Sequence, residues 1–345
     1  RKGHEATRSA AAAAAAGNIS PVRQLEQRWY ASFVSSAINV CVCLPGKALM
    51  SRGLILCLIL ACGSGCSRTE FAYRNADWFI ERYARHAVGL GEAHLGQWQP
   101  VILGILRQHR EAVMPLVISY LDTLEQAMQQ PVDTAVLECL VRGASDLYDR
   151  HAELAAGLAA PLLAMLDDAQ IRHLATYLAE RNAELHEHYH DPDPERRHAA
   201  RVERISERIE RWTGRLSDIQ QLQLAQDIRR IPDLTGPWLA NRAKQGETLV
   251  QLLKAGADET DLQSYLYRWW VRRDGLSAAV MRDWETARTE FTALLQRLGN
   301  SMSARQRATF ERHITDLHED LVVFLQDRQS PLQQQAIFTC VPPAA

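Results

Sequence analysis

The sequence lacks the usual motifs of enzyme active sites. It contains no G-x-S-x-G, no H-E-x-x-H, no glycine-rich phosphate loop and no Cys–His pair at a catalytic spacing. Adjacent carboxylates such as Asp167 and Asp168 are explained by the favourable electrostatics of acidic groups at a helix N-terminus. We therefore predict a protein that is not an enzyme and has no cofactor.

An excess of charge and a strand pattern are also missing. The 39 Lys and Arg residues nearly balance the 41 Asp and Glu residues, which leaves a formal net charge of −2. Nucleic-acid-binding domains are usually basic, so we predict no nucleic-acid partner. There is no alternating apolar run, which argues against β-structure.

The stretch Met50–Arg68 has the layout of a bacterial lipoprotein signal peptide. Met50 and the positive Arg52 precede an apolar run, Leu54–Ala61, that is far shorter than the ~20 residues a membrane-spanning helix needs. Its length suits the apolar region of a signal peptide, which runs about 7–15 residues. The other interpretation of this run is a buried strand inside a domain.

Two cysteines compete as the lipidation site at the end of this stretch. Small residues must precede the modified cysteine, and Gly63–Gly65 meet that requirement for Cys66. Cys62 is the alternative, with Ile59 in the usual aliphatic position. We predict that residues 50–65 are removed and that Cys66 carries fatty chains such as palmitate.

The segment before Met50 is predicted not to belong to the fold. Residues 1–49 contain the alanine run Ala10–Ala16 and show no sustained periodicity. They are interpreted as upstream sequence included through a wrong start assignment, or as a disordered tail.

Two cysteines follow the predicted lipidation site. An oxidising compartment would permit a bridge between Cys139 and Cys340. However, Cys139 lies on an apolar helical face and Cys340 in a proline-flanked tail, so the sequence favours two free thiols over the bridge.

From Arg68 to about Gln329 the periodicity predicts helices only, in an elongated all-α multi-helix bundle. The breaker His190–Pro194 (HDPDP) is predicted to separate two helical subdomains, residues 66–190 and 195–329, with a disordered tail at 330–345. The expected helices are Thr69–Gly91, Glu92–Val113, Leu116–Met128, Val132–Met165, Asp168–His188, Glu195–Leu216, Asp218–Arg230, Trp238–Lys254, Asp261–Arg272, Ala278–Leu298 and Ala304–Gln326.

One local pattern recurs at the predicted helix starts, and it reads as a capping box. A capping side chain accepts from a backbone N–H in the first turn, and a glutamine three residues later bonds back to the cap's own N–H. A degraded fourth copy is predicted at Leu90–His94. The three full boxes pair Asp167 with Gln170, Ser217 with Gln220, and Ser303 with Gln306.

Each of three other clusters has both a ligand-binding and a purely structural interpretation. His186 and His190 share a helical face and are weak metal-ligand candidates, because a third ligand is missing and a solvated helix end is favoured. The charged segment Glu195–Arg215 is read as a solvated amphipathic face rather than a phosphate or lipid-headgroup site. The Trp- and Arg-rich segment Trp269–Arg273 is read as core and rim rather than a ligand cage.

Two resemblances add to this reading. The segment Cys66–Trp78 (CSRTEFAYRNADW) resembles the mature start of an uncharacterised family of proteobacterial lipoproteins, a domain of unknown function. That resemblance runs to about Leu325, includes the Leu-Ser-x-x-Gln boxes and Glu180–Asn182, and implies lipid on Cys66 but no catalytic residues. The boxes alone are similar to the Leu-Thr-x-x-Gln boxes of the small cradle-shaped periplasmic chaperones of the spheroplast-protein family.

Location and function follow as expectations. Ser67 stands after the predicted lipidated cysteine, where Asp would favour retention in the inner membrane, so we expect anchoring in the outer membrane, facing the periplasm. We expect a non-enzymatic factor that binds other proteins, including unfolded or outer-membrane clients, through an apolar groove between helices. The alternatives are an enzyme or accessory factor acting on peptidoglycan or lipid, and a metal-binding periplasmic protein.

Overall fold

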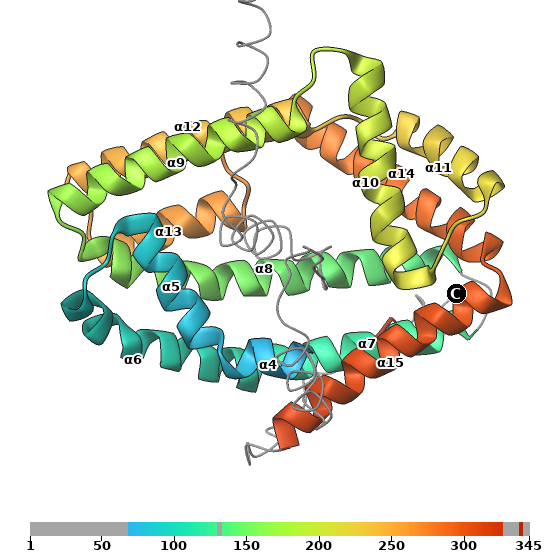
Figure 1. Cartoon of the computed structure of the whole chain (residues 1–345), viewed down its shortest axis with the longest axis horizontal. Helices are drawn as coiled ribbons and strands as arrows, with labels where there is room; N and C mark the ends of the chain where they lie inside the picture. Colours follow the sequence, from blue (N-terminus) through green and yellow to red (C-terminus); the bar gives the residue numbers. More distant parts are fainter. Residues whose placement is uncertain (1–67, 130–132, 327–337, 341–345) are drawn as a thin grey trace, which may run out of the picture. The chain divides into compact units, whose positions relative to one another are not determined.

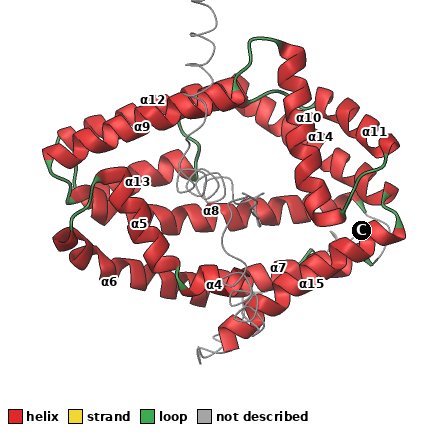
Figure 2. Ribbon diagram, viewed as in Figure 1, coloured by secondary structure: helices red, strands yellow, loops and turns green. Residues whose placement is uncertain are grey.

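The fold is all-α, as the sequence predicts. A computed structural model of the chain describes residues 68–129, 133–326 and 338–340, and these contain helices and loops but no strand (Figures 1 and 2). The helices are α4 (Arg68–Arg74), α5 (Ala76–Val88), α6 (Glu92–Gln108), the π-helix η1 (His109–Val113), α7 (Met114–Met128), α8 (Thr134–Ala164), α9 (Asp168–Tyr189), α10 (Pro194–Thr213), α11 (Asp218–Arg230), α12 (Thr235–Lys254), α13 (Glu259–Trp270), α14 (Ala278–Ser301) and α15 (Ala304–Gln326).

The predicted leader lies outside the described residues. This applies to segments 1–49 and 50–65 and to both lipidation candidates, Cys66 and Cys62. Ser64–Ala345 forms one compact unit. Among the described helices, none combines the length and the apolar character needed to span a bilayer.

The predicted first helix is divided in two. α4 ends at Arg74 and α5 begins at Ala76; Asn75 between them has a ψ of 20°, outside the helical range, and its side-chain amide donates to the carbonyl of Phe71 at 2.8 Å. α5 ends at Gly89, which has φ of 67° and so takes the left-handed conformation that glycine adopts without a steric penalty. The prediction of one helix over Thr69–Gly91 is therefore wrong in its continuity and in its end.

No break occurs between the predicted helices Glu92–Val113 and Leu116–Met128, although Pro115, which lies between them, has no backbone N–H to donate. The backbone passes from α6 into α7 through one π-helical segment, His109–Val113. Short π-helical segments are frequent at functional sites, and this one carries a partly buried histidine described below.

The main hydrophobic core combines helices from both sides of the predicted boundary. Trp98 of α6 and Ala160 of α8 share this core with Leu249 of α12 and with Leu262 and Leu266 of α13. Helix α13 packs on α8, and α12 packs along α9. The break at His190–Pro194 therefore separates helices but not cores, and the predicted two-subdomain division is wrong.

Two smaller cores complete the unit. In the second, Met114 and Leu121 of α7 pack against Ile314 and Phe324 of α15. In the third, buried residues of α11 and α14 meet the apolar stripe of α10 that the sequence predicts. That stripe supplies Val202, Ile205 and Ile209, while Trp212 from the same helix reaches the second core.

Cys139 and Cys340 form a disulfide, contrary to the expectation of two free thiols. Their Cα atoms lie 5.7 Å apart across 201 residues of sequence. The segment Phe338–Cys340 is held on α7 and α8, so the prediction of a disordered tail is wrong for these three residues; its other residues lie outside the described part.

The contacts of Phe338 explain why the tail docks there. Its backbone N–H donates to Ser119 Oγ at 2.9 Å, and its carbonyl accepts from Ser119 and Thr123 at 3.2 Å each. Its ring lies beside Tyr120 and over Gly143, where a Cβ atom would come within 2.3 Å of the ring. The apolar face around Cys139 is thus the surface that receives the tail.

All three predicted capping boxes are present. In the first, Asp167 accepts from the backbone N–H of Gln170 at 2.8 Å, and Gln170 Oε1 accepts from the N–H of Asp167 at 3.0 Å. The same reciprocal pair joins Ser217 with Gln220 and Ser303 with Gln306. The glutamines are buried, which a local capping role alone does not require.

The glutamines of the second and third boxes also hydrogen-bond to each other. The side-chain amides of Gln220 and Gln306 exchange hydrogen bonds at 2.9 and 3.2 Å. Each amide reaches further, Gln220 to the carbonyl of Ser301 and Gln306 to the carbonyl of Arg215, at the helix end that precedes the other box. One contact thereby fixes the corner α10–α11 against the corner α14–α15.

In the first half of the chain, a glutamine of a capping box also contacts another helix start. Gln170 of the box that opens α9 lies 3.2 Å from His94 Nδ1, measured from its Nε2 atom. His94 is the last residue of the degraded copy Leu90–His94, whose Leu90 is buried. The predicted fourth copy at Leu90–His94 forms no capping box, because Gly91 precedes α6 without a side-chain cap; only the contact of His94 with Gln170 joins this helix start to the box of α9.

Substitution of the paired glutamines tests this function of the boxes. Gln220→Ala and Gln306→Ala are each expected to lower the free energy of unfolding by about 1–3 kcal/mol, because each leaves buried polar groups without a partner. The double variant is expected to lose less than the sum of the two, by about 0.5 kcal/mol or more. Urea denaturation measures both, with exposed Gln221→Ala as the control within about 0.5 kcal/mol of the parent. Additive losses would contradict the pairing.

Candidate functional site

Helix α10 begins next to the break His190–Pro194 and carries most of the candidate site. Asp193 caps it by accepting from the N–H of Glu195 at 2.9 Å, and Pro194 occupies the first turn. The apolar stripe of α10 faces the third core, which directs its many charged side chains away from that core.

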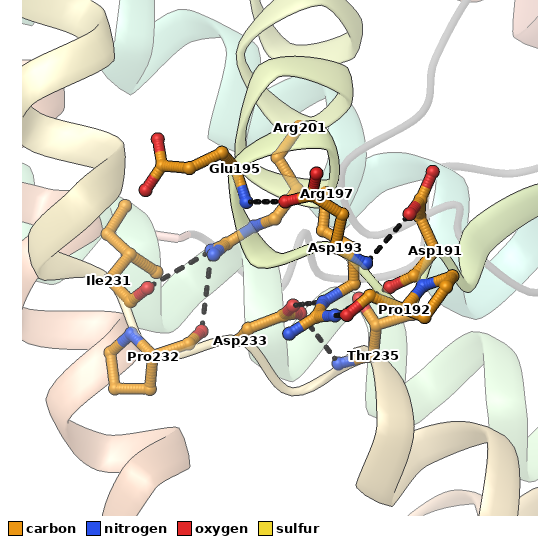
Figure 3. Close-up of polar contacts among 10 residues, drawn as sticks. All are labelled: Asp191, Pro192, Asp193, Glu195, Arg197, Arg201, Ile231, Pro232, Asp233 and Thr235. Carbon is orange, nitrogen blue, oxygen red and sulfur yellow. Dashed lines mark hydrogen bonds and ion pairs between the residues drawn. The ribbon is translucent and has the colours of Figure 1, made fainter.

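Two arginines of α10 attach the helix to the loop between α11 and α12 (Figure 3). Arg201 donates to the carbonyls of Ile231 and Pro232 at 3.1 and 3.4 Å. Arg197 donates to Asp233 at 3.4 Å and to the carbonyl of Asp191 at 2.5 Å. These guanidinium groups satisfy loop carbonyls that no helix would pair.

Acidic side chains next to these arginines are stabilised in their charged form. Burial alone would raise the pKa of Asp233, but hydrogen bonds from Thr235 and Arg197 bring it below its usual value. A hydrogen bond from the Arg229 guanidinium lowers the pKa of Glu195, and the two form an exposed two-point ion pair at 2.7 and 3.0 Å. The adjoining cleft, of about 290 Å³, is therefore lined by arginines that already have partners.

A larger groove adjoins this cleft between α10 and α11. Its volume is about 520 Å³, and His198 and Arg229 line both cavities. Its apolar lining residues are Ala199, Val202, Leu222, Leu224 and Ala225. Glu203 and Arg229 also line it, so the groove combines an apolar surface with charges of both signs.

Two large apolar side chains, Ile219 and Leu222, stand exposed on the first turns of α11, and Leu222 lines this groove. Ile219 is 80% exposed and Leu222 is 67% exposed, whereas Leu224 and Ile228 of the same helix are buried in the third core. α11 thus has two apolar faces, of which the fold uses one. Sequence reasoning missed this second face, although the three-residue spacing of Ile219 and Leu222 was visible.

The two histidines that the sequence marks as weak metal-ligand candidates lie next to each other. His186 and His190 are exposed at the end of α9, with ring centroids 4.5 Å apart. Across the described residues no group of three or more His, Cys, Asp or Glu side chains is placed to hold a metal ion. The histidine pair remains a sequence-based candidate only.

The Trp- and Arg-rich segment is part of the packing. Trp269 and Trp270 pack against the main core. Arg273 lies over the rings of Tyr148 and Trp284, at 6.0 and 5.7 Å from their centroids. The space between these two rings is therefore occupied by the protein's own guanidinium group.

The structure adds a partly buried hydrogen-bond chain that the sequence did not reveal. Tyr73 of α4 lies 2.6 Å from Nδ1 of His109 in η1, measured from its hydroxyl oxygen. Nε2 of His109 is 3.0 Å from Nε2 of His151 in α8, and Nδ1 of His151 is 2.6 Å from the carbonyl of Leu147. The three residues are 36 and 42 positions apart, so no local spacing could have indicated this chain.

The Leu147 carbonyl sets the direction of this chain. Because a carbonyl can only accept, Nδ1 of His151 carries the hydrogen and its Nε2 atom accepts from His109. Nδ1 of His109 is then free to accept from the Tyr73 hydroxyl. Burial, followed by electrostatic interaction with His151 and Arg110, lowers the pKa of His109 to about 3, and burial raises the pKa of Tyr73 to about 12. Both groups are therefore neutral over most of the pH range.

Comparison with known proteins bears on residues 100–270. This segment matches a family of unknown function, DUF6279. The match confirms the resemblance to a domain of unknown function over this segment and adds no activity, location or partner. No curated protein and no solved structure matches the chain. The third full box and the paired corner at α14–α15 lie beyond the matched segment.

Proposed function

We propose that the protein is a lipid-anchored cell-envelope factor that binds another protein through the groove between α10 and α11, and that it acts without catalysis. The observation that carries this proposal is the exposed Leu222, which lines a groove of about 520 Å³ and follows the exposed Ile219 by three residues on the same helix. Large apolar side chains grouped at a concave surface are typical of protein interaction sites.

The chemistry of the groove favours an amphipathic helix or an unfolded apolar segment as the partner. Apolar side chains at three- and four-residue spacing would lie against Val202, Leu222 and Ala225. Glu203 offers a negative charge that can orient a partner carrying a positive one, whereas Arg229 is already paired with Glu195. Unfolded or outer-membrane clients meet this description.

The disulfide supports a location outside the reducing cytoplasm. Bridges such as Cys139–Cys340 form and persist in oxidising compartments, of which the bacterial periplasm is one. Anchoring through Cys66, with Ser67 permitting export to the outer membrane, would place the groove in the periplasm. The match to a family of unknown function is compatible with this proposal and does not test it.

Site-specific photo-crosslinking in intact cells tests the groove. A photoreactive benzoyl-phenylalanine at Leu222 is expected to give a discrete protein adduct, because this side chain would contact the partner directly. The same probe at Leu103 of α6, which is 51% exposed, is the matched control and is expected to give none. Ala199→Trp, which would fill the groove from an exposed position, should reduce the Leu222 adduct about tenfold or more.

Two results would overturn the proposal. One is adduct formation of equal strength at Leu103 and Leu222, which would indicate collisions rather than a site. The other is an adduct at Leu222 that Ala199→Trp leaves unchanged, since a partner seated in the groove would be displaced. Thermal unfolding monitored by circular dichroism verifies that each variant is folded.

A further inference from the structure

The outer face of α4 and α5 carries a stripe of aromatic and basic side chains. Its members are exposed and follow one another at three- and four-residue steps across the two consecutive helices, drawn in blue in Figure 1. They are Phe71, Arg74, Trp78, Arg82 and Arg85. We call this set the aromatic–basic stripe.

The stripe is not used by the fold. Phe71 is 60% exposed and Trp78 is 53% exposed, although the opposite side of α5 is buried in the main core through Ala84, Ala87 and Val88. Large aromatic side chains at this exposure cost free energy in water, since each leaves apolar area unburied.

The charges of the stripe are positive, and two of its arginines have acidic partners. The guanidinium of Arg82 lies over the Trp78 ring, 5.6 Å from its centroid. Arg85 pairs with Glu92 at 2.8 Å on the exposed surface, where such pairs are weak, whereas Arg74 pairs at 2.6 Å with the largely buried Glu70. An aromatic ring beside a guanidinium suits the lipid headgroup region, where the ring reaches the acyl boundary and the cation meets phosphate.

The position of the stripe in the chain indicates which surface it meets. α4 begins at Arg68, two residues after Cys66, so the chain between them spans at most about 7 Å. Phe71 follows within one helical turn. If Cys66 is acylated, the lipid therefore holds the start of the stripe at the headgroups, whatever the rest of the molecule does.

We propose that the aromatic–basic stripe Phe71–Arg85 lies on the surface of an anionic phospholipid bilayer and acts as a second contact beside the lipid on Cys66. This inference rests on the anchor in the proposed function. The fatty chains predicted on Cys66 attach the protein to the bilayer but hold only the start of α4, so they do not orient the rest of the molecule. Aromatic insertion and arginine–phosphate pairing would fix which side of α5 faces the membrane.

Vesicle co-sedimentation measures this contact without the acyl chains. The compact unit Ser64–Ala345 with Cys66→Ser is mixed with phosphatidylethanolamine–phosphatidylglycerol vesicles or with phosphatidylcholine vesicles. The parent is expected to bind the anionic vesicles more strongly. Phe71→Ser/Trp78→Ser should lower the partition coefficient about tenfold or more, because binding scales with the buried apolar area.

Two further variants keep the result decisive. Arg82→Glu retains both rings and should weaken binding to anionic vesicles while leaving binding to neutral ones nearly unchanged. Ile219→Ser/Leu222→Ser removes comparable apolar surface from the groove and should sediment with vesicles as the parent does. Sedimentation that is equal for the parent and Phe71→Ser/Trp78→Ser, or that falls equally in the groove variant, would overturn the inference. If the double stripe variant does not fold, Arg82→Glu decides alone.

Palmitate labelling in cells separates this inference from the anchor. Label that depends on Cys66 together with no vesicle binding by the stripe would refute the stripe and retain the anchor. Vesicle binding that depends on the stripe without labelling at Cys66 or Cys62 would refute the anchor, and the stripe would then be the only membrane contact.

Discussion

Replacing Cys139 with Ala is expected to lower the free energy of unfolding by about 3–5 kcal/mol. The bridge to Cys340 closes a loop of 201 residues, and restricting so long a loop in the unfolded chain is worth several kcal/mol in the chain-entropy model. In addition, the variant releases the tail that places Phe338 against Tyr120 and Gly143. Urea denaturation of the unit Ser64–Ala345 with Cys66→Ser measures the difference.

The reductant dithiothreitol supplies the control for this prediction. It should destabilise the parent by about as much as the substitution does and leave Cys139→Ala unchanged. Cys340→Ala should match Cys139→Ala, and the double variant should lose no more than either, because all three remove the same bond. A parent whose stability is unaffected by dithiothreitol would show that the bridge does not form in solution.

Helix positions were well predicted where the sequence marks the start of a helix. The predicted bounds Asp218–Arg230 and Ala304–Gln326 agree with α11 and α15, and both helices begin at a capping box. The box specifies its start through hydrogen bonds that are local in sequence, so the residues alone define it. Where no such mark exists, as at Asn75, the helix break was missed.

Long-range features were predicted poorly, for a physical reason. The motif His190–Pro194 ends a helix because its residues disfavour one, but this says nothing about which core the next helices join. Leu249 of α12 joins the main core because α12 packs along α9, and no local pattern encodes that pairing. The disulfide was missed in the same way, because the apolar face around Cys139 was assigned to helix packing.

The position of the groove was not predicted, and its role as a binding site stays a proposal. An apolar groove between helices was expected, and one lies between α10 and α11. The apolar stripe of α10 was identified correctly, yet it faces the core, while the exposed side chains Ile219 and Leu222 belong to α11. Periodicity shows that a helix has an apolar face, and only the packing shows which of two faces remains open.

The partly buried histidine is expected to make the protein less stable in acid. His109 has a pKa of about 3 in the fold, against an ordinary value of 6.5. Between these values the unfolded chain binds a proton that the folded chain does not, so the free energy of unfolding falls by about 1.4 kcal/mol per pH unit as the pH decreases. From pH 6.5 to pH 4.5 His109 alone should account for a loss of about 2 kcal/mol.

Two variants isolate this contribution from other titrating groups. His109→Asn keeps one hydrogen bond of the chain but does not titrate, so at pH 7 it should be about 1–3 kcal/mol less stable than the parent. This deficit should shrink by about 2 kcal/mol at pH 4.5, because only the parent loses stability through His109.

Tyr73→Phe shows whether the pH dependence comes from titration of His109 or from a general loss of packing around it. This variant loses the hydroxyl that His109 accepts from, at a cost of about 1 kcal/mol, but retains the imidazole and its neighbours Arg110 and His151. Its stability should therefore fall with pH as steeply as that of the parent. Urea denaturation at pH 4.5, 5.5, 6.5 and 7.0 gives the slopes. Equal slopes for the parent and His109→Asn would mean that His109 takes up its proton without unfolding, and that the Tyr73–His109–His151 chain is open to water.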